Sequence, residues 1–421
     1  MEGPTILQAI ELLIGLLGLA VVVALIARAV RLPDTVALVI AGLLVGGLAT
    51  QVGAEPVRIP HELVLGVLLP GLVFEAAYRL ELEVIRRWIA ALLILAIPGV
   101  LITAGVVAVA LNVVAGVPLE LAFIAGAIVS ATDPAAVVAT FKQLRVPRSL
   151  ATMVDGESLL NDGTGLVLFA IAVAAITTPI SPGGAVIAFT AAVGLSVVVG
   201  LVAGLIAAAV VRYIEDPLIE LTISVVLAYG TYLLADGLGL SGVLSTVTAA
   251  IVLGNFGGRV LSQGGSDAID IVWSFLAYLL TAIAFLLIGM AIPPVRLMGS
   301  LWPITWAIVG ILVGRALIVY VVLGGISRLA PIPGLERRIP VGWSNVLFWS
   351  GLRGAVAVAM ALAIPDDVPQ RALLQDVTFG VVLFTLLGQA TTVGRLVSRF
   401  ASDPEEAPSV GHETRRSPAA E

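Results

Sequence analysis

Three acidic residues fall within one long apolar segment of this chain. The segment covers residues 149–177 and contains the sequence Asp155-Gly156-Glu157-Ser158-Leu159-Leu160-Asn161-Asp162-Gly163-Thr164. In a helix of 3.6 residues per turn, Ser158 and Asp162 share one face, while Glu157 and Asn161 share the adjoining face. Such a helix offers carboxylate, amide and hydroxyl oxygens within apolar surroundings. Polar residues can also serve only to join helices, but three acids so close together favour a functional site.

The composition excludes a soluble protein. Of the 421 residues, 59% are apolar and only 12% are charged, and the mean hydropathy is +1.12. Soluble domains carry about 25% charged residues, so this chain lacks the polar surface needed to cover a globule in water. Without cysteine the chain has no disulfides, thiolate nucleophiles or cysteine-based metal sites. The two histidines, His61 and His412, are expected to be solvated, and no cofactor or nucleic-acid partner is expected.

Thirteen apolar runs approach or exceed the roughly 20 residues that a helix needs to cross a bilayer. They lack the alternating pattern of a membrane β-barrel, so we expect an all-α polytopic membrane protein. The predicted spans are 6–27, 34–50, 62–78, 88–113, 120–141, 149–177, 184–211, 217–236, 240–256, 268–292, 301–326, 342–363 and 373–396.

The distribution of basic residues predicts the topology. With thirteen spans and the N-terminus outside, 17 of the 22 Lys and Arg residues fall in cytoplasmic segments, and only Arg58, Arg296 and Arg371 fall outside. Such an excess of cytoplasmic positive charge is typical of helical membrane proteins. The start, Met-Glu-Gly-Pro, has no basic region and does not resemble a signal peptide. The polar segment 401–421 is predicted to be a short, disordered cytoplasmic tail.

Two of the predicted spans are expected to be broken. In Ala131-Thr132-Asp133-Pro134, the proline removes a backbone donor and disfavours helical geometry at Asp133. The alternative is a simple proline kink that Asp133 caps. In Gly351-Leu352-Arg353-Gly354, two glycines flank an arginine in the middle of a span.

A second intramembrane arginine, Arg315, lies in the eleventh span. Because an unpaired charge in a membrane is costly, either Arg315 or Arg353 must balance Glu157. The fifth and twelfth spans lie seven crossings apart and so run in opposite directions. Two oppositely directed broken helices are typical of inverted-repeat secondary transporters. Spans 1–6 and 8–13 would be the two repeats, joined by span 7.

Four motifs of this chain resemble those of the monovalent cation:proton antiporters, in particular the sodium/proton exchanger branch. The resemblance runs from the first to the thirteenth span. The motifs are Phe74-Glu75-Ala76, Thr132-Asp133-Pro134, Glu157-Ser158-Leu159-Leu160-Asn161-Asp162 and Gly351-Leu352-Arg353-Gly354.

The resemblance implies a homodimer whose protomers have two parts. The panel, or dimer part, comprises helices 1–3 and 7–10, about residues 1–85 and 184–295. The ion-transporting core comprises helices 4–6 and 11–13, about residues 86–183 and 296–400. The implied activity is electroneutral exchange of Na⁺ or Li⁺ for H⁺ by alternating access, in the inner membrane of a prokaryote.

The resemblance also implies a role for each motif residue. Asp162 would be the carboxylate shared by cation and proton, Glu75 would approach the ion through water, and Asn161 would accompany electroneutral exchange. Glu157 would be paired with an arginine, Arg315 being favoured, and Arg353 would neutralise helix ends. The implied ion ligands are Asp162, Asp133, Ser158 and Thr132, with Asn161 beside them.

Three alternatives remain open from the sequence. The first is a K⁺/H⁺ antiporter of the same fold, because residue types do not separate these ions. An intramembrane aspartyl protease would also place two aspartates on adjacent helices, but Asp162 follows Leu160-Asn161 rather than the expected Gly-x-Gly, and the two arginines would have no role. A cation channel would lack coupling to protons.

Overall fold

The computed structural model describes residues 6–30, 32–51, 60–144, 146–257, 261–329 and 339–400. Within these ranges every regular element is a helix, and none is a strand. The predicted disordered tail, 401–421, lies outside the described residues together with His412. So do the first five residues and several arginines counted in the topology argument, namely Arg31, Arg58, Arg145, Arg259, Arg337, Arg338, Arg415 and Arg416.

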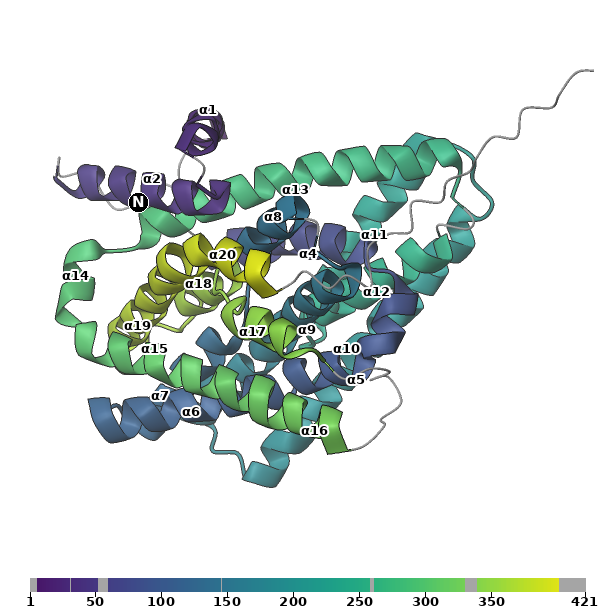
Figure 1. Ribbon diagram of the computed structural model, residues 1–421. Coiled ribbons are helices and arrows are strands. Elements are labelled where there is room, and N and C mark those ends of the chain that lie inside the picture. The colour runs from purple at the N-terminus through teal and green to yellow at the C-terminus, as the bar shows by residue number, and fades with distance from the viewer. Residues whose placement is uncertain are drawn as a thin grey trace, which may run out of the picture.

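The helices follow one another closely along the chain (Figure 1). The first half contains α1 (Ile6–Val30), α2 (Asp34–Gln51), α3 (His61–Leu63), the π-helical η1 (Val64–Leu68), α4 (Leu69–Tyr78), α5 (Leu82–Ala96), α6 (Pro98–Ala115), α7 (Leu119–Ser130), α8 (Ala135–Leu144) and α9 (Arg148–Thr177). The second half contains α10 (Pro182–Val211), α11 (Pro217–Gly237), α12 (Gly242–Phe256), α13 (Gln263–Ala291), α14 (Pro294–Gly299), α15 (Leu301–Ala316), the π-helical η3 (Leu317–Leu323), α16 (Gly324–Leu329), α17 (Val341–Trp349), α18 (Ala355–Leu362), α19 (Arg371–Phe384), the π-helical η4 (Thr385–Gln389) and α20 (Ala390–Phe400).

The helices account for all thirteen predicted membrane spans. Ten stretches of the described chain are long and apolar enough to cross a bilayer, and two shorter apolar helices cover 34–49 and 242–256. The remaining predicted span, the twelfth at 342–363, is the pair α17 and α18. Outer faces of the helices are apolar, as on α10, where Val186 and Ile187 are exposed. The prediction of an all-α integral membrane protein is confirmed.

Helices α6 and α15 pack closely and run in opposite directions. A methyl group added to Gly310 would lie 3.0 Å from Cα of Val107, and one added to Gly314 would lie 2.9 Å from Cα of Thr103. Residues later in α15 contact residues earlier in α6, so the two helices are antiparallel. Figure 1 shows α15 and α16 as one long rod beside α6. These helices are the fourth and eleventh predicted spans, which also run in opposite directions in the predicted order.

Helices α2 and α13 pack equally closely but run in the same direction. A methyl group at Gly42 would lie 3.0 Å from Cα of Gly289, and one at Gly46 would lie 2.9 Å from the carbonyl oxygen of Met290. Small residues allow backbones to approach in this way inside membranes. These helices are the second and tenth predicted spans, which run in the same direction in the predicted order of thirteen spans. The directions of both helix pairs therefore agree with that order.

Candidate functional site

Both predicted breaks are present, and they touch each other. The chain is extended or irregular over residues 131–134, between α7 and α8, and over 350–354, between α17 and α18. Pro134 cannot donate to the helix at the first of these positions. The backbone N–H of Asp133 donates to the carbonyl of Leu352 at 2.9 Å. The two unwound segments therefore cross side by side in the middle of the bundle.

One carboxylate caps two helices at this crossing. Oδ1 of Asp133 accepts a hydrogen bond from the backbone N–H of Ala135 at 2.9 Å, and Oδ2 accepts one from Ala355 at 3.2 Å. These are the first residues of α8 and α18, whose N-terminal ends carry partial positive charge. A side chain at Gly354 would overlap the Asp133 carboxylate, so glycine is needed there for this close approach.

Each broken helix also has a C-terminal end with partial negative charge, and an arginine lies at each one. Nε of Arg353 donates to the carbonyl of Val129, near the end of α7, at 2.8 Å, and its Nη1 donates to Gly351. Nη2 of Arg315 donates to the carbonyl of Leu347, near the end of α17, at 2.7 Å. All four half-helix ends at the crossing thus face a group of opposite charge.

Glu157 is paired with Arg315 rather than with Arg353. Nη1 and Nη2 of Arg315 contact the two carboxylate oxygens of Glu157, the second at 2.9 Å. Glu157 is 1% exposed and Arg315 is 5% exposed. A bidentate arginine–carboxylate pair satisfies both charges where water cannot. It contributes no net charge to the site.

Asn161 joins α9 to the first break through Thr132. Oδ1 of Asn161 accepts the backbone N–H of Thr132 at 3.0 Å, and Nδ2 donates to Oγ1 of the same threonine at 2.7 Å. That hydroxyl is also 2.9 Å from Oγ of Ser158, one turn before Asp162 on α9. The motif residues of the fifth and sixth spans therefore form one buried polar cluster.

Asp162 lies next to this cluster and is 7% exposed. Among the described residues no group donates a hydrogen bond to its buried Oδ1. Buried polar atoms are nearly always paired, so this oxygen is suited to a ligand. No three His, Cys, Asp or Glu side chains gather in the described residues, and the oxygens that do gather suit a single small cation.

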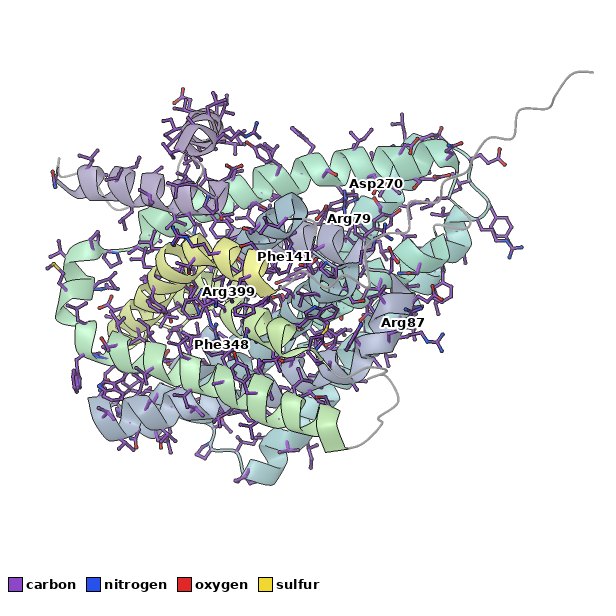
Figure 2. The ribbon with its side chains drawn as sticks, viewed as in Figure 1. Arg79, Arg87, Phe141, Asp270, Phe348 and Arg399 are labelled. Atoms are coloured by element: carbon purple, nitrogen blue, oxygen red, sulfur yellow. The ribbon has the colours of Figure 1, made fainter. Side chains whose placement is uncertain are left out.

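Glu75 occupies a different environment. It is one turn before Arg79 in α4, and Oε1 of Glu75 lies 2.7 Å from Nε of Arg79. Nη2 of Arg79 also donates to Oγ of Ser274 in α13 at 2.6 Å, and Figure 2 shows Arg79 close to Asp270 of that helix. The approach of Glu75 to the ion through water stays a prediction.

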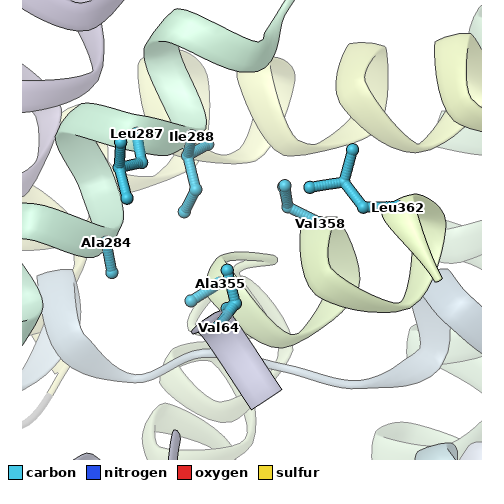
Figure 3. A pocket seen from close by; sticks show the side chains of 7 residues that line it. All are labelled: Val64, Ala284, Leu287, Ile288, Ala355, Val358 and Leu362. Carbon is cyan, nitrogen blue, oxygen red and sulfur yellow. The ribbon is translucent and has the colours of Figure 1, made fainter. Parts of the chain in front are cut away.

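A small apolar cavity adjoins the crossing (Figure 3). Its volume is about 10 Å³, and hydrocarbon surrounds it. Ala355, which donates to Asp133, is one of its lining residues. A cavity so small and apolar is an unfavourable place for water. The lining comes from η1, α13 and α18, namely Val64, Ala284, Leu287, Ile288, Ala355, Val358 and Leu362.

Sequence reasoning missed the backbone partners of the site. The carbonyls of Val129 and Leu347 and the amide of Ala355 belong to ordinary apolar residues, and no side-chain pattern marks them. The one available signal is their position, since each lies a few residues from a predicted break, where backbone groups lose their helical partners.

Two crossing broken helices with buried carboxylates, in a bundle of antiparallel and parallel spans, define a secondary transporter of the inverted-repeat type. The model of the sodium/hydrogen exchanger family, transmembrane region, matches residues 16–399. The chain belongs to the sodium/hydrogen exchanger family. The prediction that it is not an enzyme agrees with this membership of a transporter family.

Curated relatives cover most of the chain. The Na⁺/H⁺ antiporter ApNhaP of Aphanothece halophytica is 35% identical over 375 residues, which are 88% of this chain and 70% of that protein. The Na⁺/H⁺ antiporter NhaH of Halobacillus dabanensis is 31% identical over 398 residues, covering 91% of this chain and 96% of its own length.

The sodium proton antiporter MjNhaP1 of Methanocaldococcus jannaschii has a similar solved structure. Its TM-score with this chain is 0.75 at 21% sequence identity, and the match covers 94% of this chain and 99% of that one. This similarity establishes the fold, including the predicted antiporter architecture.

Proposed function

We propose that the chain exchanges Na⁺ or Li⁺ for H⁺ across the membrane, with cation and proton competing for Asp162. The names of its relatives support Na⁺ and H⁺ as the transported ions. The observation that carries the proposal is the buried Oδ1 of Asp162, which accepts no hydrogen bond from the described residues and lies one turn after Ser158, whose hydroxyl contacts Thr132 of the first break.

The groups around Asp162 form a ligand set suited to a small monovalent cation. Asp133 is partly exposed and points its carboxylate toward the two helix ends, while Ser158 supplies a hydroxyl oxygen. Thr132 lies in the unwound segment, where its backbone carbonyl is free of a helix. Asn161 uses both ends of its amide on Thr132, so we assign it the role of holding that segment in place. Oxygen ligands of this kind suit hard cations.

Exchange follows from the cost of a bare charge in the core. A carboxylate without a partner costs several kcal/mol to hold in apolar surroundings. Asp162 loses its net charge when it binds a proton or a monovalent cation, and either loaded form can change its exposure from one side of the membrane to the other. The empty site keeps its charge and cannot make this change. Cation and proton are coupled because each excludes the other.

The charges around the site support electroneutral exchange. Glu157 and Arg315 cancel within their ion pair, and Asp133 and Arg353 are opposite charges on the two touching breaks. Asp162 is then the carboxylate whose charge is left for the cargo. One proton or one monovalent cation neutralises it, which gives one ion in each direction. Asn161, adjacent to it, adds no further charge.

We further propose that the two parts of the protomer move against each other. The core would contain α5–α9 and α15–α20, and the panel would contain α1–α4 and α10–α13 and form a homodimer. The apolar cavity of Figure 3 lies where α18 of the core meets η1 and α13 of the panel. Apolar surfaces of this kind can separate and close again during alternating access. The protein would reside in a prokaryotic inner membrane, with its N-terminus outside and its C-terminus cytoplasmic.

Exchange by purified protein in liposomes tests the proposal. A pH-sensitive dye inside the vesicles reports proton flux when Na⁺, Li⁺ or K⁺ is added, with the membrane voltage clamped or free. We expect Na⁺ and Li⁺ to drive proton flux without dependence on voltage, and Asp162→Asn to abolish it. A response to K⁺ alone would mean that the transported cation is K⁺ and not Na⁺. Normal exchange by Asp162→Asn would refute the assignment of the site.

A further inference from the structure

A threonine that belongs to none of the sequence motifs binds the second break. The backbone N–H of Arg353 donates to Oγ1 of Thr385 at 3.1 Å. The hydroxyl of Thr385 in turn lies 3.0 Å from the carbonyl of Val382 in its own helix and 3.4 Å from the carbonyl of Arg353. Thr385 is 1% exposed and begins the π-helical segment η4. Its hydroxyl thus serves a backbone amide that has left its helix.

The first half of the chain contains the same arrangement. There, the backbone N–H of Thr132 in the first break donates to Oδ1 of Asn161 at 3.0 Å. In both halves the acceptor comes from the next membrane span, 29 residues later for Thr132 and 32 residues later for Arg353. No sequence identity between the halves marks this relation, but the contacts relate Asn161 to Thr385.

The contact of Thr385 lies between the two contacts that the second break makes with Asp133. Leu352, immediately before Arg353, accepts the backbone N–H of Asp133, and Ala355, two residues after Arg353, donates to the Asp133 carboxylate. Fixing the backbone of Arg353 therefore fixes both groups that hold Asp133. A buried amide without an acceptor would be unfavourable, and the segment would shift to find one.

We propose that Thr385 is a positioning residue of the ion site, the counterpart of Asn161 in the second half of the chain. This inference rests on the proposed function, because it assigns Thr385 an effect on cation binding through Asp133. Thr385 does not touch the ion. Its hydroxyl keeps the unwound segment 350–354 in the register that presents Leu352 and Ala355 to Asp133.

The chain offers a matched control in the same span. Thr378 is as deeply buried as Thr385, but within the described part of the chain its hydroxyl donates only to the carbonyl of Leu374 in its own helix, at 2.9 Å. This is the ordinary bond of a threonine within a helix. Thr378→Val removes a buried hydroxyl without touching either break, whereas Thr385→Val removes the acceptor for Arg353 and keeps the side-chain volume.

Two measurements on the full-length protein separate positioning from general stability. In liposomes we expect Thr385→Val to raise the KM for Na⁺ about fivefold, the effect of one lost hydrogen bond, with a smaller change in maximal rate. Thr385→Ser should restore a KM within about twofold of the wild type, and Thr378→Val should match the wild type. Hydrogen–deuterium exchange should show faster exchange of the amides of residues 350–356 in Thr385→Val alone.

Wild-type KM and unchanged amide exchange in Thr385→Val would overturn the proposal, as would equal effects in Thr378→Val. If Thr385→Val does not fold, Thr385→Ala provides the same comparison. The two proposals fail separately. A wild-type protein that moves no cation refutes the proposed function, while amide exchange at 350–356 still decides whether Thr385 holds the segment.

Discussion

Replacing Arg315 by leucine removes the positive half of a buried ion pair. The structure gives Arg315 two partners, the Glu157 carboxylate and the carbonyl of Leu347. The side chains of Arg315 and Glu157 are only 7% and 2% exposed, so water cannot screen the charge that is left behind. Breaking such a buried pair costs about 3–5 kcal/mol. For a chain of this length, 4 kcal/mol corresponds to a fall in melting temperature of roughly 5 °C.

A second variant separates the cost of the unpaired Glu157 charge from the cost of the lost hydrogen bond to the carbonyl of Leu347. In Arg315→Leu combined with Glu157→Gln, no unpaired charge remains, and the loss should be limited to neutral groups, namely the carbonyl of Leu347 and the new amide at position 157. An unsatisfied buried acceptor costs about 1–3 kcal/mol. The double variant should therefore melt above the single variant Arg315→Leu, even though it carries one more substitution.

The assay is thermal unfolding of purified protein in one detergent, followed by intrinsic fluorescence. An exposed pair serves as the control, because Nη1 of Arg148 lies 3.5 Å from Oε1 of Glu81 with both side chains largely in solvent. Arg148→Leu should change the melting temperature by about 1 °C or less. A single variant Arg315→Leu as stable as Arg148→Leu, or a double variant that melts below Arg315→Leu, would refute the reasoning.

Three further predictions concern the site and its surroundings. Lowering the pH should raise the apparent KM for Na⁺ by up to about tenfold per pH unit without lowering the maximal rate, because protons compete with Na⁺ for one site. A fall in the maximal rate with an unchanged KM, measured in initial-rate assays, would contradict this. Gly354→Ala should abolish exchange at normal expression, since the new Cβ overlaps a capping carboxylate. Because the chain lacks cysteine, a short thiol cross-linker between Leu287→Cys and Val358→Cys should stop exchange reversibly, while one between Val64→Cys and Ala284→Cys, both in the panel, should not.

Much of the fold was predictable because its signals are local. Apolar runs of sufficient length mark the spans, and a proline after Asp133 marks a break without any knowledge of its neighbours. The glycines around Arg353 marked the other break. The parity of the spans then placed the two broken spans in opposite directions, and the spans before them, α6 and α15, are antiparallel as the same parity predicts.

Less of the site was predictable, because its contacts join distant residues through the backbone. Arg353 binds a carbonyl 224 residues earlier in the chain, and the residue that supplies it, Val129, has an apolar side chain with no signal of its own. Charge balance required an arginine for Glu157 but did not choose between two of them. The choice of Arg315 follows from its position at the end of α15, from which its side chain reaches Glu157 of α9 and the carbonyl of Leu347 in α17.

The central claim is that one carboxylate, Asp162, holds either a proton or a cation. The most direct test adds Na⁺ to purified protein in a weakly buffered detergent solution and measures the protons released with a pH dye. The account predicts release that approaches one proton per protomer in wild-type protein at low pH, and none in folded Asp162→Asn. Undiminished proton release by Asp162→Asn would contradict it.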